Sequence, residues 1–374
     1  MLINVFDKNL NRLGVAEELT CLIWRRRYWE CGSFALQLPV TEKHAALMQK
    51  GNLIIPHGYD EAGVIQYVHI RKDSEGLEQI EVQGKFLPRW IGKRIVIDQI
   101  VETAASPEAI VRRIAEENVI SPKDAARKIK QISGSAAEPT GVLMEYTSEV
   151  NANALSEIEY VCRAAEVGFR VRTDARDRVN TLVVYAGRDL TAGNAHGNKP
   201  CIFAQEYDNI IEQAYTIDDE DARNMAYVGG EDDGENPRVI VQVGEDRVGL
   251  ERDEIFVEAV DIGKSYVNED GAEITLSDAE YRDMLVQRGK SDLAQRAEVL
   301  EFDSRVSPAA NLVYREDYDV GDVVTCRNKR WGVQANVRIT EVIETYQTGE
   351  TEIEVIFGQA MPTVSDKIKR IERG

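Results

Sequence analysis

The chain has 374 residues, of which 43% are hydrophobic, and a formal net charge of −20 at pH 7. This length supports a sizeable core in two or three domains, and no stretch reaches the roughly 20 apolar residues that a membrane-spanning helix needs. Residues 201–300 contain 26 Asp and Glu against 9 Lys and Arg. Nearly all of the net charge therefore lies in one part of the chain, and a surface of that sign repels nucleic-acid phosphates.

The N-terminus indicates synthesis in a cytoplasm, and the cysteines indicate free thiols. "MLINVFDKNLNRLG" has neither the apolar run nor the cleavage site of a secretory signal. The five cysteines are widely spaced and form no CxxC pair. We therefore expect free thiols, without a disulfide framework or a zinc site.

The first part of the chain, residues 1–104, is predicted to be a β-barrel domain. In "LIWRRRYWECGSFALQLP" (22–39), a two-residue period places Leu22, Trp24, Arg26 and Tyr28 on one face of a strand, and "ECG" turns the chain into a second strand. Residues 64–84 have the pattern of another hairpin. Several short strands at this spacing are typical of a barrel.

Residues 105–200 are predicted to be an α+β insertion domain. Ser106 and Pro107 form a helix-start signal, because serine caps helices well and proline fits the first helical position. A second helix is expected at 154–166, and "VGFRVRTDARDRVNTLVVYAG" (167–187) reads as a hairpin.

Residues 201–374 are predicted to be a second β-barrel domain that carries the acidic region and one long helix over 277–300. Ser277 and Glu280 have the spacing of a capping box, and Gly289 predicts a break or kink in the helix. The overall class is therefore α+β and β-rich, with two β-barrel domains, an insertion and one long helix.

A weak internal repeat connects the two ends of the chain. "VIQYVHIRKDSEGLEQIEVQGKFLP" (64–88) and "VRITEVIETYQTGETEIEVIFGQAMP" (337–362) share a long strand, a glycine-containing turn and an "IEV" return strand. Upstream, "CGSFAL" (31–36) is matched with "VGDVVT" (320–325). Any two hairpins share part of this pattern, but the common order favours two related β domains.

No catalytic motif is present: the sequence lacks HExxH, GxSxG, GxGxxG and a P-loop. We therefore assign no catalytic, cofactor-binding or metal-binding residue. The acidic clusters lack the twelve-residue loop of a calcium site and read as solvated turns. A pair of carboxylates for glycoside hydrolysis stays open, because their separation in space is not visible in a sequence.

The arginines of the strip at 22–39 have two interpretations. Arg25, Arg26 and Arg27 either flank an exposed sheet and stack on Trp24, Tyr28 or Trp29, or they hold nucleic acid. Binding of nucleic acid needs a wider basic surface than three arginines in a balanced segment, so we favour a structural or interface role.

Several segments together resemble a known family. "LIWRRRYWECGSFALQLPV", "GVIQYVHI", "VQGKFLPRWIGKRIV", "DNIIEQAYTIDDEDARNMAYVGGE" and "YDVGDVVTC…RITEVIE" occur in an order and spacing similar to those of the ReqiPepy-type tail-associated proteins of siphophages and prophages. The resemblance covers nearly the whole chain, and its motifs are structural rather than catalytic.

By further analogy, such proteins resemble tail-tip and baseplate hubs, in which each subunit of a trimer contributes two tail-tube-like barrels to a ring. The resemblance implies a non-enzymatic virion protein, made in the host cytoplasm and located in the tail. Its implied partners are its own copies, the tail tube or a distal tail protein, and a distal fibre or receptor-binding protein. DNA would only pass through the lumen, and neither a cofactor nor a stable membrane association is implied. The alternative is a tail-associated enzyme that degrades cell walls with a carboxylate pair.

Two groups of residues are the candidate sites in this interpretation. The aromatic and basic strip has the composition of a subunit interface, and the acidic clusters would line the lumen or face a charged partner. The interface candidates are Trp24, Arg25, Arg27, Tyr28 and Trp29. The acidic candidates are Asp218, Asp219, Glu220, Asp221, Glu231, Asp232 and Asp233.

Overall fold

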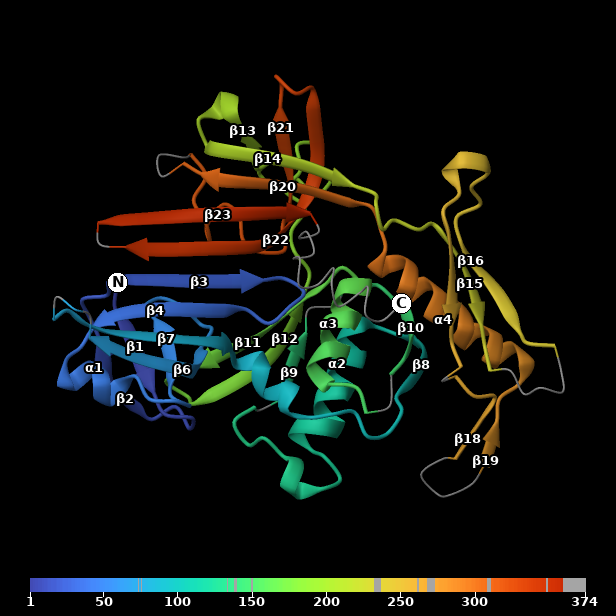
Figure 1. Ribbon diagram of the computed structural model, residues 1–374, viewed down its shortest axis with the longest axis horizontal. Helices are drawn as coiled ribbons and strands as arrows, with labels where there is room; N and C mark the ends of the chain where they lie inside the picture. The colour runs from blue at the N-terminus through green and yellow to red at the C-terminus, as the bar shows by residue number, and fades with distance from the viewer. Residues whose placement is uncertain are drawn as a thin grey trace.

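The computed structural model describes residues 1–358, apart from 73, 75, 133, 138–139, 149–150, 232–236, 261, 268–272, 308–310 and 348. Within these residues the protein is β-rich α+β, which confirms the predicted class. One sheet of 13 strands runs through both ends of the chain, and the helices and smaller sheets lie beside it (Figure 1). No helix in this part of the chain is long and apolar enough to cross a membrane.

The N-terminal half of the large sheet contains seven antiparallel strands in the order β3-β4-β7-β6-β5-β1-β2. A short helix, α1 (Glu42–Leu47), begins after its cap Thr41. The strands are β1 (Ile3–Phe6), β2 (Arg12–Ala16), β3 (Cys21–Arg27), β4 (Ser33–Pro39), β5 (Leu53–Pro56), β6 (Gly63–Lys72) and β7 (Glu78–Phe86).

The inward face of β3 is the one that the two-residue period predicts. Leu22 and Trp24 are fully buried and pack with Leu36 of β4 and Val82 of β7 in one core. Arg26 follows on the same face and is buried as well. The alternation therefore carries a charged side chain into the interior.

The segment between β7 and the C-terminal half contains small sheets and two helices. Ser106 Oγ accepts from Ala109 N at the start of α2, and Asn153 caps α3, so the predicted helix starts are confirmed. Side chains of both helices share a core with the N-terminal half. The elements are β8 (Val101–Ala105), α2 (Pro107–Ala115), β9 (Ser135–Ala137), β10 (Met144–Thr147), α3 (Ala154–Ala164), β11 (Gly168–Asp174) and β12 (Val179–Tyr185), with short η helices at Leu87–Lys93, Glu116–Ile120 and Ala125–Arg127.

The C-terminal half continues the large sheet in the order β14-β20-β23-β22, with β21 paired to β22 and β13 paired to β21. In Figure 1 it lies above the N-terminal half. Its strands are β13 (Ile202–Ala204), β14 (Ile210–Asp218), β20 (Val299–Val306), β21 (Val323–Asn328), β22 (Val333–Gln347) and β23 (Glu350–Gly358).

A separate unit lies between β14 and β20 and has its own small core. Its helix begins with the predicted capping box of Ser277 and Glu280. The predicted break at Gly289 is wrong, because the helix continues through it. A Cβ there would lie 2.8 Å from Val228 and Val243, so the glycine lets the helix approach the sheet. The elements are β15 (Met225–Gly229), β16 (Ile240–Gly244), β17 (Glu254–Glu258), β18 (Ser265–Val267), β19 (Glu273–Thr275) and α4 (Asp278–Gln295), with a short η helix at Gly249–Glu251.

The strand registers confirm that the two repeated hairpins are equivalent. The β6–β7 ladder has a bulge between Ile65 and Tyr67, and the β22–β23 ladder has one between Ile339 and Glu341. Counting from these bulges, the first "IEV" (80–82) falls at the same positions as the second (353–355). A bulge at one position in two hairpins is a specific shared feature, because bulges are local and rare along a strand.

The upstream match between "CGSFAL" and "VGDVVT" is wrong, because the counterpart of Gly321 is Gly51. Gly51 N donates to Ile65 O and Gly321 N donates to Ile339 O, at equivalent positions before the two bulges. Both glycines have positive φ, +91° and +98°. The segments "GNLI" (51–54) and "GDVV" (321–324) therefore correspond, and β5 is the counterpart of β21.

With this correction the two halves have one topology. The order β3-β4-β7-β6-β5 in the N-terminal half corresponds to β14-β20-β23-β22-β21 in the C-terminal half. Residues 28–32 connect β3 to β4, whereas residues 219–298 separate β14 from β20, so the α4 unit is an insertion in the second copy. Among the described strands, no pairing closes either half, and the predicted closed barrels are not confirmed.

Gly321→Ala is expected to destabilise the protein by about 3 kcal/mol, because the new Cβ would lie 2.3 Å from the ring of Tyr28 and the backbone has positive φ. Gly332→Ala is the matched control, with φ +68° and no atom within 4 Å of the new Cβ, and we expect a loss of about 1 kcal/mol. Urea unfolding measures both. Equal losses would contradict tight packing of Tyr28 at this glycine.

Candidate functional site at the seam between the two halves

The two halves meet edge to edge through β3 and β22. Seven residue pairs form this seam, from Arg27 opposite Glu341 to Cys21 opposite Gln347. β22 is long enough to change partners, because its first part, Val333–Arg338, pairs with β21 instead. In Figure 1 the dark blue β3 lies directly beside the red β22. The strip at 22–39 thus connects segments that lie about 300 residues apart in the sequence.

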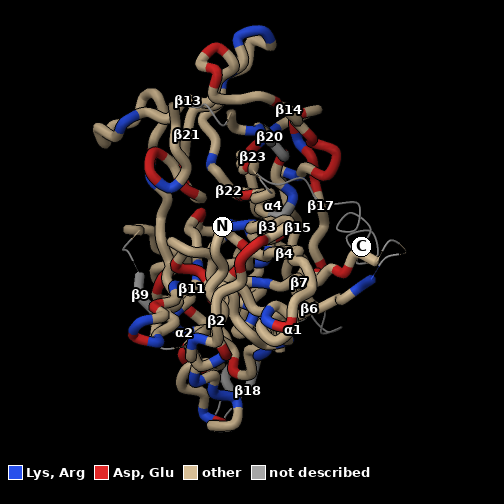
Figure 2. The backbone as a smooth tube through the Cα atoms, turned by 90° about the vertical axis from the view of Figure 1, so that its left-hand side faces the viewer, with Lys and Arg blue, Asp and Glu red and all other residues tan. Residues whose placement is uncertain are grey.

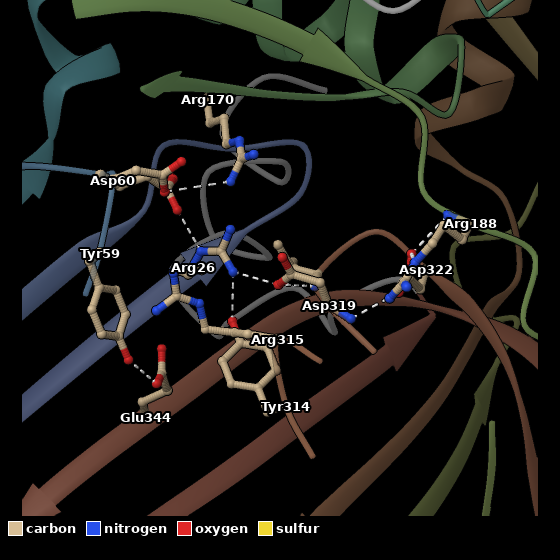
Figure 3. A network of polar contacts seen from close by, with 12 residues as sticks. Arg26, Tyr59, Asp60, Arg170, Arg188, Tyr314, Arg315, Asp319, Asp322 and Glu344 are labelled. Atoms are coloured by element: carbon tan, nitrogen blue, oxygen red, sulfur yellow. Dashed lines mark hydrogen bonds and ion pairs between the residues drawn. The ribbon is translucent and has the colours of Figure 1, made fainter. Parts of the chain in front are cut away.

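Arg26 is the centre of the seam and is only 3% exposed. Its guanidinium lies 2.5 Å from carboxylate oxygens of both Glu61 and Asp319, and it donates to the hydroxyl of Tyr314 (Figure 3). Burial alone would lower the pKa of Arg26, but the surrounding groups raise it well above its ordinary value. Because Glu61 comes from the first half and Asp319 from the second, the ion pairs join the two halves.

Arg25 and Arg27 point to the other face of the sheet and share one carboxylate. Arg25 Nε lies 3.1 Å and Arg27 Nε 2.7 Å from oxygens of Glu341 on the facing strand. Among the described contacts, neither arginine stacks on the ring of Trp24, Tyr28 or Trp29, so the predicted stacking is wrong. The cation over Tyr28 is Arg338, 5.2 Å from the ring centroid.

Tyr28 connects the seam to the segment between the halves. Its hydroxyl accepts from Gly187 N at 3.0 Å and lies within hydrogen-bond distance of the carbonyls of Glu166 and Tyr185. Its backbone N–H donates to Thr340 O of β22. Through its side chain and its backbone, Tyr28 therefore joins β3 to both β22 and the intervening segment.

A further buried carboxylate, Glu344, lies on β22 opposite Trp24. It accepts hydrogen bonds from the hydroxyls of Tyr59 and Tyr346, while its Oε1 has no partner. Burial raises the pKa of Glu344. Arg315 covers the ring of Tyr59, with its guanidinium carbon 4.1 Å from the centroid. The seam thus has an aromatic and carboxylate cluster next to the Arg26 ion pairs.

The structure places the predicted interface residues mainly inside this chain. Trp24 and Tyr28 have no exposed surface, so their contacts are within one subunit. Arg25 and Arg27 keep about a third of their side-chain surface exposed, and Trp29 is partly buried. Contact of these three residues with a partner stays a prediction.

The acidic candidates are only partly described. Asp218 ends β14, Asp219, Glu220 and Asp221 form the following turn, and Glu231 is exposed, whereas Asp232 and Asp233 lie outside the described residues. In Figure 2, where Asp and Glu colour the backbone tube red, red segments lie near β14. Within the described ranges, no group of three or more His, Cys, Asp and Glu could hold a metal ion, and all five cysteines are free thiols.

Sequence reasoning missed the acidic partners of the seam: Glu61, Asp319, Glu341 and Glu344. One signal was available, because an arginine on the apolar face of a strand predicts a buried acidic partner. The sequence offers many acidic residues as candidates, and nothing in the spacing identifies these four.

The fold is that of phage and prophage tail proteins. The 43 kDa tail protein of prophage MuSo2 from Shewanella oneidensis superimposes with a TM-score of 0.59 at 11% identity, covering 96% of this chain and 98% of that one. The tail protein from Neisseria meningitidis MC58 gives 0.54 at 12% identity over 96% of both chains. Prophage tail protein gp18 from Listeria monocytogenes EGD-e gives 0.54 at 12% identity, covering 100% of this chain and 98% of that one.

The sequence identifies the family. Residues 2–359 match the model of the Siphovirus ReqiPepy6 Gp37-like proteins, and the chain belongs to that family. This confirms the resemblance seen in the sequence. No curated protein matches the chain in sequence.

Arg26→Met is expected to destabilise the protein by about 3–5 kcal/mol, because it leaves Glu61 buried without its cation. The double variant Arg26→Met/Glu61→Gln should recover part of the loss. Arg12→Met, at an exposed position of β2, is the control and should change stability by less than about 0.5 kcal/mol. If urea unfolding gives Arg26→Met the same midpoint as the control, the ion pairs do not stabilise the seam.

Glu344→Gln is expected to stabilise the protein at pH 8, because burial raises the pKa of Glu344 and makes the ionised carboxylate unfavourable in the folded state. A raised pKa in the folded state means that the ionised carboxylate costs stability above that pKa. This cost shrinks as the pH falls from the folded pKa towards the ordinary pKa of a glutamate, below which it is gone. The advantage of the variant should therefore shrink at lower pH. Thermal unfolding at several pH values measures it.

Glu341→Gln is the control for this experiment, because it weakens the ion pairs with Arg25 and Arg27 and should lower stability at pH 8. If Glu344→Gln lowers stability at pH 8 as much as Glu341→Gln, the charge on Glu344 is not a cost.

Proposed function

We propose that this protein is a structural hub or tail-tip component. Three copies of the chain would form a ring, and the ring would join the tail tube to distal receptor-binding components. The observation that carries the proposal is the repeated topology of the two halves, joined edge to edge in one sheet. Three such chains would place six similar halves around one axis, which suits a tube of sixfold symmetry.

Each half would act as a barrel-like unit, although its strands leave an opening. Side chains approach one another across this opening in both halves. In the first half Trp24 lies against Tyr59, with ring centroids 6.0 Å apart, and in the second half Asn328 donates to Gln213 at 2.8 Å. In each half the contact runs from the first strand, β3 or β14, to the end of β5 or β21 or the residues just after it, which supports two barrel-like units of one design.

The domain organisation in this proposal keeps the sequence-based boundaries. Residues 1–104 and 201–374 would form the ring, and residues 105–200 would brace the seam from one side. The contacts of Tyr28 with Glu166 and Gly187 support that bracing role. Part of the acidic surface, including Asp219 and Glu220, would line the channel and keep DNA from sticking to it during passage.

Electron microscopy of the purified protein, alone and with its tube protein, tests the proposal. We expect rings of three chains, seated on the ends of tubes, with a mass measured by light scattering that matches three copies. Protein that neither assembles nor binds tube ends would overturn the proposal. Clearing of bacterial cell walls in a zymogram, abolished by one carboxylate substitution, would replace it with the enzymatic alternative.

A further inference from the structure

Among the unpaired strand edges of the large sheet within the described part of the chain, two are equivalent to the strands of the seam. β14 ends the sheet and pairs only with β20. β6 pairs with β5 only at Gly63 and Val64, and beyond the bulge its residues 67–72 pair with β7 alone. By topology, β14 is the second copy of β3, and β6 is the first copy of β22.

We propose that β14 of one chain pairs with β6 of a second copy of this chain, in the register that β3 and β22 use within one chain. This inference deepens the proposed function, on which it rests, because it names the contact between neighbouring subunits of the ring. Such a contact is head to tail, so it closes into a ring when the rotation allows. Each open edge would therefore pair with a strand from a second copy of this chain. The seam shows the same pairing within one chain.

The registers define which residues would meet. Counting through the β20 and β23 ladders, Trp24 corresponds to Tyr215 and Arg26 to Ile217. Counting from the bulge, Val342 corresponds to Val68 and Glu344 to Ile70. Because Trp24 faces Glu344 and Arg26 faces Val342 in the seam, Tyr215 would face Ile70 and Ile217 would face Val68 between chains.

The exposed side chains on the two edges suit each other. Ile70 is 53% exposed and Ile217 is 54% exposed, although each lies on a strand of the large sheet. An open edge with exposed apolar residues invites pairing, and soluble proteins normally protect such edges. Pairing would cover these residues by cross-strand contacts and add a row of backbone hydrogen bonds.

The charges on the opposite face also complement each other. On that face β6 carries Arg71 beyond its bulge, and β14 carries Glu212 and Asp218. In the proposed register Arg71 is opposite Ala214 and diagonal to Glu212, within reach of a long side chain. The proposed pairing between chains thus has apolar contacts and surface charges at the positions where the seam within one chain has buried ion pairs. That difference fits a joint made between folded chains, because no charge has to be buried during assembly.

Disulfide trapping tests the register. In a Cys21→Ser background, His69→Cys and Thr216→Cys would face each other between chains, at the position where Arg25 faces Ile343 in the seam. The seam bond from Tyr28 N to Thr340 O makes this a non-hydrogen-bonded pair, in which the side chains lie closest. Ile23→Cys/Thr345→Cys, the intrachain pair at the neighbouring non-hydrogen-bonded position, is the positive control. His69→Cys/Ile217→Cys is the register control.

On a non-reducing gel, mild oxidation should convert the interchain pair to a covalent trimer, with little cross-linking of the register control. Trimers of normal mass without cross-links would overturn this inference and leave the proposed function standing. Cross-linked polymers longer than three chains would support the edge pairing and contradict the closed ring. Chains that stay monomeric without cross-links would overturn the pairing.

Ile70→Lys and Ile217→Lys provide a second measurement, since both positions are exposed and should leave the fold intact. Each should raise the protein concentration for half-assembly at least about tenfold, by placing a charge in an apolar cross-strand pair. Leu13→Lys on β2, at a position 47% exposed, is the matched control and should leave assembly unchanged. Unchanged thermal unfolding of the chains shows that they are folded. Normal assembly of both variants would contradict the pairing.

Discussion

The structure depends on the seam between β3 and β22, because this one ladder makes two sheet halves into a single sheet. Its constraint is electrostatic as well as geometric. Arg26 points inward by the alternation of β3, and a buried guanidinium is stable only where carboxylates surround it. Glu61 and Asp319 meet that need from opposite halves. The ion pairs of Arg26 therefore favour one register between β3 and β22. A shift of this register by one residue would turn Arg26 to the other face of the sheet.

The seam also explains the place of the segment between the halves. Tyr28 immediately follows β3, and its ring lies between Gly168 and Gly321, where an added Cβ at either glycine would come within 2.3 Å of it. Its hydroxyl reaches backbone groups of the intervening segment. A hinge between the halves at this point would break those contacts, so the packing around Tyr28 opposes hinge motion there.

The sequence-based predictions were correct for features that depend on residues close to one another in the chain. The alternation over residues 22–28, the caps at Ser106 and Ser277, and the repeated "IEV" hairpin all depend on neighbours within a few residues. The predictions failed at Gly289, where a kink was expected and a close helix–sheet contact was found. They also failed in matching Gly321 with the turn before β4, because a glycine at a strand start is common and only the hydrogen bonds of Gly51 and Gly321 identify equivalent positions.

By itself the sequence determined the β-rich class, the faces of the strands, the helix starts and the family, because these follow from periodicity, capping and characteristic segments. Only the tertiary structure decided the role of the strip at 22–39. Arg26 lies 35 residues from Glu61 and 293 residues from Asp319 in the sequence, and no local rule selects those partners from 65 acidic residues. The same three arginines could have formed an exposed surface. Pairing of β3 with β22 placed one of them inside and two on a shared carboxylate.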